Sequence, residues 1–192
     1  MKFPRVARVA AGRRAFQARA RAAIVAPMNL LIIKMTSLGD VVHLLPALTE
    51  AAGRVPGLAA DWVVEEGFAA IPAWHPAVER VIPSAIRRWR RGLAHAATWA
   101  EMAALRRAIR ARDYDLVLDA QGLAKSALVA LLARGPRAGL ALGSAREGLA
   151  CLAYQRRYPA PRELHAISRN RLLMARALGY EKIGRASCRE RV

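Results

Sequence analysis

The chain has 192 residues, of which 55% are hydrophobic, and a formal net charge of +18 at pH 7. This length accommodates one ordinary domain and excludes two full catalytic domains. No stretch approaches the roughly 18 uninterrupted apolar residues of a membrane-spanning helix. The two cysteines, Cys151 and Cys188, have neither metal-ligand spacing nor a disulfide pattern, which suits a reducing compartment.

The positive charge is unevenly distributed along the chain. Residues 1–27 carry +7 without an acidic residue and residues 183–192 carry +2, which leaves +9 for residues 28–182. The remaining charge favours an anionic substrate or a membrane surface as a partner. A nucleic-acid-binding domain is an alternative of a different class, although no RNA-binding signature is present and the basic residues do not form a stripe.

Both ends differ in composition from the segment between them. Residues 1–27 are rich in Arg and Ala, and we interpret them as a basic extension upstream of the true start at Met28. An amphipathic surface helix and a targeting peptide are the alternatives. Residues 183–192, IGRASCRERV, resemble the translation of a sequencing adapter, so we expect them to be foreign to the protein. The expected domain is therefore residues 28–182.

Strands and helices alternate in the predicted domain. Short apolar runs predict strands at residues 29–33, 61–65, 78–82, 116–118 and 138–142. Helical spacing predicts helices from residue 40 onward and at residues 67–74, 98–112, 123–133 and 163–178. This order predicts an α/β fold, a Rossmann-like parallel sheet with helices on both faces. Its ligands are expected beyond the carboxyl ends of the strands.

The segment after the first strand, KMTSLGD, ends in Asp40 at the start of a helix. It is neither a Walker motif nor a dinucleotide fingerprint. An aspartate there either caps the helix or faces the cleft as a general base. His43 is three residues further on and either packs in the fold or faces the same cleft. Glu65, at the end of the second strand, either is solvated or binds a sugar hydroxyl.

Two later segments also follow predicted strands. Residues 86–91, IRRWRR, form a dense basic cluster whose guanidinium groups suit carboxylates and phosphates, while Trp89 could lie against a sugar or an acyl surface. The alternative is a solvated, arginine-rich loop. Residues 119–126, DAQGLAKS, form a strand-to-helix turn that adds Gln121 and Lys125 as candidates.

Four stretches carry a resemblance to a known family. They are LLIIKMTSLGDVVHLLPALTEA, DWVVEEGFAAIPAWHPAVERVIPSAIRRWRR, YDLVLDAQGLAKSALVA and SAREGLA. In this order they resemble the lipopolysaccharide heptosyltransferases of glycosyltransferase family 9, in particular the heptosyltransferase I group. The resemblance implies the N-terminal half of a two-domain GT-B glycosyltransferase. A member of the same family that adds a later heptose is the alternative.

The resemblance also implies an activity and its residues. Heptose would pass from ADP-heptose to a Kdo residue of Kdo2-lipid A with inversion, and Asp40 would be the catalytic base. Met35 stands where many relatives carry a small hydroxyl residue. The substrate-binding residues that the resemblance implies are Thr36, Ser37, Gly39, Arg87, Arg88, Arg90, Arg91 and Arg146.

The same resemblance defines the expected partners. The acceptor Kdo2-lipid A would bind residues 28–182, whereas ADP-heptose would bind a C-terminal donor domain that we expect this chain to lack. We therefore expect the chain alone to be inactive. No metal or other cofactor and no nucleic acid is expected, and the implied location is the cytoplasmic face of the bacterial inner membrane, as a peripheral protein.

Overall fold

The computed structural model of the protein describes residues 27–181. The predicted basic extension and the predicted adapter-derived tail, apart from Pro27, lie outside the described residues. No helix among the residues described is long and apolar enough to cross a membrane.

Six parallel strands form one sheet in the order β3-β2-β1-β4-β5-β6. Their bounds are Met28–Ile33 for β1, Leu58–Glu65 for β2, Val78–Ser84 for β3, Leu116–Asp119 for β4, Arg137–Leu140 for β5 and Arg156–Tyr158 for β6. The central strand β1 pairs with β2 on one side and β4 on the other. Because successive strands diverge from this point, the topological switch of the sheet lies between β1 and β4. The predicted Rossmann-like architecture is confirmed.

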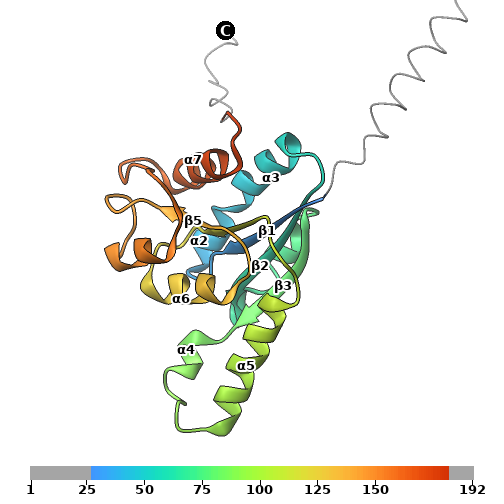
Figure 1. Cartoon of the computed structure of the whole chain (residues 1–192), viewed down its shortest axis with the longest axis vertical. Helices are drawn as coiled ribbons and strands as arrows, with labels where there is room; N and C mark the ends of the chain where they lie inside the picture. The colour runs from blue at the N-terminus through green and yellow to red at the C-terminus, as the bar shows by residue number, and fades with distance from the viewer. Residues whose placement is uncertain (1–26, 182–192) are drawn as a thin grey trace, which may run out of the picture.

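Helices cover both faces of this sheet (Figure 1). One face carries α2 (Leu38–Val42), α3 (Leu45–Arg54) and α7 (Ala166–Leu178), and the other carries α4 (Ile86–Trp89), α5 (Ala96–Arg110) and α6 (Ala124–Leu132). Short 3₁₀ turns span Glu66–Phe68, Pro72–Trp74 and Gly148–Ala153.

The alternation of side chains along β1 builds both halves of the core. Leu30 and Ile32 pack on the side of α3 and α7, and Leu31 and Ile33 pack on the side of α5 and α6. All four are fully buried. A strand buried on both faces reads as a continuous apolar run, which is why the sequence predicted β1 correctly.

Two predictions about elements were wrong. The helix expected from residue 40 is two helices, because Pro46 near the start of α3 has no N–H to continue the hydrogen bonding of α2. The helix expected at residues 67–74 is a pair of 3₁₀ turns, the second beginning at Pro72. Residues 86–91, for which no element was predicted, contain the short helix α4.

Candidate active site

The loop between β1 and α2 is held in place by Gln121, which follows β4. The side-chain oxygen of Gln121 accepts hydrogen bonds from the backbone N–H groups of Met35 (3.0 Å) and Thr36 (3.2 Å). Its side-chain nitrogen donates to the carbonyl of Thr36 at 2.6 Å. Since Gln121 and Thr36 are both buried, three backbone groups of the loop depend on this one amide. Gln121 therefore fixes the path of the chain into α2.

Asp40 uses its two carboxylate oxygens for different contacts. Oδ2 accepts a hydrogen bond from the backbone N–H of Ser37 (3.0 Å), the residue that caps α2. Oδ1 lies 3.8 Å from Nζ of Lys34 and 3.6 Å from Nη2 of Arg146. The side chain is 16% exposed. The two roles considered for Asp40 are therefore compatible, since one oxygen stabilises the start of the helix and the other remains directed at the cleft.

A small cavity of about 50 Å³ opens beside Asp40 at the carboxyl ends of β1 and β4. Cations from three separate segments line it: Lys34 after β1, Arg146 after β5 and Arg169 on α7. Gln121 and Asn170 also lie in its wall, and Asp40 is the only acidic residue among the lining residues that the structure describes. This excess of positive charge suits an anionic ligand whose hydroxyl group faces the carboxylate.

Burial shapes the electrostatics of this cavity. It lowers the pKa of Lys34, and the charge of nearby Asp40 acts in the opposite direction. Lys34 donates a hydrogen bond to the carbonyl of Ala120 at 2.8 Å, which satisfies one of its N–H groups. Burial, together with Arg162 and Arg146, also lowers the pKa of Arg169. The fold therefore holds Lys34 and Arg169 in a site where they have lost part of the hydration that they would have at the protein surface.

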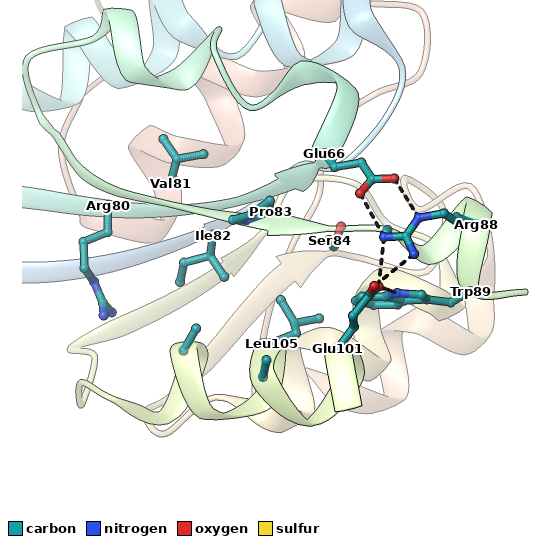
Figure 2. Close-up of a pocket in the computed structure, with 13 residues that line it drawn as sticks. Glu66, Arg80, Val81, Ile82, Pro83, Ser84, Arg88, Trp89, Glu101 and Leu105 are labelled. Carbon is teal, nitrogen blue, oxygen red and sulfur yellow. Dashed lines mark hydrogen bonds and ion pairs between the residues drawn. The ribbon is translucent and has the colours of Figure 1, made fainter. Parts of the chain in front are cut away.

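The basic cluster around α4 forms a second region, separate from this cavity. The Arg88 guanidinium donates to the carboxylate of Glu66 (Nε–Oε1 and Nη2–Oε2, both 3.1 Å) and to that of Glu101 (Nη1–Oε1, 3.1 Å), as Figure 2 shows. These hydrogen bonds lower the pKa of Glu66 and of Glu101. They close one end of a cavity of about 410 Å³ between β3 and α5.

Trp89 is mostly buried in the core, although it also lines two cavities. It is only 6% exposed, packs in the core with Leu105 and donates from Nε1 to Glu101 at 2.5 Å. Its position inside the short helix α4 turns the indole toward the sheet and leaves the flanking arginines in solvent. The exposed Arg87, Arg90 and Arg91 therefore flank an indole that is mostly buried.

The structure brings together only some of the predicted site residues. Asp40, Gln121 and Arg146 line one cavity, and Thr36, Ser37 and Gly39 shape the loop that leads to Asp40. Three of these, Asp40, Gln121 and Arg146, come from sequence positions that lie far apart and meet because parallel strands end at one edge.

Other predicted residues lie elsewhere. His43 does not line the cavity, because its ring faces that of His165, with 5.6 Å between the ring centroids. Glu65 is buried, and its carboxylate accepts a hydrogen bond from the backbone N–H of Arg87 (3.1 Å), so it positions the start of α4. Lys125 lines an apolar groove beside α6.

Sequence reasoning missed Lys34, Arg169 and Asn170 as site residues. A lysine directly after a buried strand was a usable signal for Lys34. Arg169 and Asn170 had none, because their part in the site depends on the tertiary packing of α7. Asn170 donates to the carbonyl of His43, which follows α2, at 3.1 Å, and Arg169 donates to that of Ser144, which follows β5, at 2.8 Å.

Known proteins are similar to this chain in sequence and in fold. Residues 102–187 match the family described as glycosyltransferase family 9 (heptosyltransferase). Lipopolysaccharide heptosyltransferase 1 of Escherichia coli K12 is 54% identical over 156 residues, which are 81% of this chain and 49% of that protein. The chain is a homologue of these family 9 heptosyltransferases over about half of their length. The Pseudomonas aeruginosa enzyme of the same name is also 54% identical, over 80% of this chain and 43% of its own length.

Solved structures of this glycosyltransferase family agree with the fold. E. coli heptosyltransferase WaaC with ADP-2-deoxy-2-fluoro heptose superposes with a TM-score of 0.80 at 53% identity, over 81% of this chain and 50% of that one. E. coli heptosyltransferase II gives a TM-score of 0.55 at 21% identity, a likeness of fold alone. The chain thus has a Rossmann-like fold that matches half of a GT-B enzyme, and it spans about half the length of the curated relatives that it matches.

Proposed function

We propose that the protein acts in lipopolysaccharide inner-core synthesis as heptosyltransferase I, moving L-glycero-D-manno-heptose from ADP-heptose to a Kdo residue of Kdo2-lipid A. Identity of 54% over 156 residues to lipopolysaccharide heptosyltransferase 1 favours this acceptor over a core that already carries heptose. Residues 28–182 would bind the acceptor, and ADP-heptose would bind the half of the relatives to which this chain does not align.

The observation that carries the proposal is the environment of Asp40. Asp40 is the one acidic residue of a cavity whose other polar lining residues, in the described part of the chain, are cations and amides, and its Oδ1 lies near two of the cations. In the proposed step Oδ1 takes the proton of the Kdo hydroxyl, the freed oxygen attacks the anomeric carbon of heptose, and ADP leaves with the bonding electrons. This single displacement inverts the anomeric carbon and needs no covalent enzyme intermediate.

The surrounding cations would hold the acceptor. Arg146 is 58% exposed and can turn from Asp40 to a Kdo carboxylate while staying at the cavity. Arg87, Arg90 and Arg91 are exposed beside the same sheet edge and would contact carboxylates and phosphates further along the acceptor. Their charge would also hold the protein at the anionic cytoplasmic surface of the inner membrane.

Acceptor binding tests the proposal without requiring turnover. The deacylated headgroup of Kdo2-lipid A is titrated into the chain in a calorimeter, and Arg146→Ala is expected to weaken binding by roughly tenfold or more, the loss of one charge-assisted contact. Arg134→Ala is the matched control, because Arg134 is similarly exposed (56%) and pairs with Asp113 at the opposite ends of the strands. Equal affinities in the two variants would contradict an acceptor site at Asp40.

The same titration distinguishes the acceptors and the donor. The headgroup without heptose is expected to bind more tightly than one that already carries heptose, and the reverse order would favour a later heptosyltransferase. ADP-heptose is expected neither to bind nor to be consumed by the 192 residues alone. Measured turnover of ADP-heptose by these 192 residues would contradict the proposal that acceptor and donor bind to different halves of the enzyme.

A further inference from the structure

An apolar groove runs between α6 and the hairpin formed by α4 and α5, on the face of the sheet opposite α3 and α7. It has a volume of about 430 Å³, within the range of about 300–1,000 Å³ that is usual for sites of small organic ligands. Leu93, Met102, Leu128 and Leu132 are among its lining side chains, while Arg90 and Lys125 are the two charged residues that line it. No part of the proposed reaction uses this groove.

The groove leaves large apolar side chains in contact with water. Leu128 is 65% exposed, Leu93 52% and Leu131 50%. Helix α6 packs Ala127, Val129 and Ala130 inward and contains one charged residue, Lys125, so its outer side is apolar as well. A continuous apolar surface with a charged rim is typical of a binding site, whereas isolated exposed leucines are not.

The groove borders the basic cluster around α4. At one end Arg90 follows α4 and belongs to the basic cluster of residues 86–91. Lys125, the other charged residue of the groove, lies in the first turn of α6. A ligand whose anionic group is held by the basic cluster would reach this apolar surface next.

We propose that this groove binds an acyl chain of the anionic glycolipid that serves as acceptor, an inference that rests on the proposed function. The two cations at its rim favour a ligand that joins an apolar chain to an anionic group. The same charge disfavours docking of residues 1–26, which contain seven basic residues and no acidic one. Arg90 or Lys125 would pair with the phosphate while the chain lies against Leu128 and Leu93.

Chain length separates this proposal from simple phosphate binding. Dodecyl phosphate, kept below its micelle concentration, and butyl phosphate are titrated into the chain in a calorimeter. Each methylene removed from water strengthens binding about fourfold, so burial of half of the extra methylenes predicts roughly 250-fold tighter binding of dodecyl phosphate. Dodecyl maltoside, which is uncharged, is expected to bind at least tenfold more weakly than dodecyl phosphate. Affinity that does not depend on chain length would overturn the proposal.

Matched leucine variants locate the site. Leu128→Glu is expected to weaken dodecyl phosphate binding tenfold or more, because it places a carboxylate in the apolar wall and near the anionic group. Leu152→Glu is the control, since Leu152 is 76% exposed and lies outside the groove. Leu128→Ser provides the same comparison if Leu128→Glu fails to fold. Equal losses in both glutamate variants, or none in either, would refute the assignment.

A second copy of the chain is the competing occupant. Sedimentation equilibrium of the wild type and of Leu128→Glu tests it, and the proposal predicts a monomer in both cases. A wild-type dimer that Leu128→Glu dissociates would overturn the proposal. Tight binding of the Kdo2-lipid A headgroup without binding of dodecyl phosphate would reject the groove alone and leave the proposed function standing.

Discussion

Replacing Gln121 by methionine removes the amide that holds the loop between β1 and α2. The variant keeps the volume of the side chain but leaves the N–H groups of Met35 and Thr36 and the carbonyl of Thr36 without their partner. A buried polar group without a partner costs about 1–3 kcal/mol, and since two of the three share one acceptor we expect a loss of about 2–4 kcal/mol. For a chain of this size that corresponds to a melting temperature lower by about 4–16 °C.

Urea and thermal denaturation followed by circular dichroism measure this loss. Gln155→Met is the control, because Gln155 is exposed and accepts a single hydrogen bond, from the backbone N–H of Arg137. We expect it to change the free energy of unfolding by less than about 0.5 kcal/mol. If both variants unfold at the same urea concentration, Gln121 does not fix the loop as described.

A glutamate at the same position adds a second test. In Gln121→Glu the carboxylate keeps an acceptor for the N–H groups of Met35 and Thr36 but has no N–H to donate to the carbonyl of Thr36. We therefore expect this variant to lose less stability at neutral pH than Gln121→Met, and denaturation in urea measures the difference. A larger loss than in Gln121→Met would contradict the hydrogen-bond assignment.

Two further predictions concern packing and charge. Gly139→Ala places a Cβ 2.4 Å from Cε2 of buried Tyr154, so we expect denaturation to show a loss of about 1–3 kcal/mol. The control Gly53→Ala meets no atom within 4 Å in α3 and should stabilise by roughly 0.5–1 kcal/mol. Because burial lowers the pKa of Lys34, the unfolded chain binds this proton more tightly, and stability should rise with pH from the folded-state pKa up to about 10.5. That contribution should disappear in Lys34→Met, and an unchanged alkaline profile would count against a buried, charged Lys34.

The fold could be predicted largely because its strands are buried on both faces. The mostly apolar runs of β1, β2 and β4 identified them, and their alternation with helices specified a parallel sheet. The short strand β6 was missed, since its sequence Arg-Arg-Tyr at the edge of the sheet has no apolar pattern. The side chains of β6 are the least buried of the sheet, and it is burial that gives a strand a recognisable apolar sequence.

The candidate site could be predicted only where local sequence determines the geometry. The position of Asp40 at the start of a helix after a strand left capping and catalysis as alternatives, and the resemblance to the heptosyltransferases favoured the catalytic role. The role of Trp89 stayed open in the sequence because the same indole can serve a core or a ligand, and the direction of α4 places it both in the core and in the wall of two cavities. Arg169 reaches the cavity through tertiary packing of α7, which no local pattern encodes.

The proposal that Asp40 is the catalytic base is tested most directly by turnover. Residues 28–181 are joined to the carboxyl-terminal half of E. coli lipopolysaccharide heptosyltransferase 1, and ADP release is measured with ADP-heptose and Kdo2-lipid A. Asp40→Asn is expected to lower kcat by about 10²–10⁴-fold, the usual contribution of a general base, while Asp113→Asn, 81% exposed at the opposite strand ends, should match the wild-type chimera. An Asp40→Asn chimera that keeps more than about a tenth of the wild-type kcat would contradict the account.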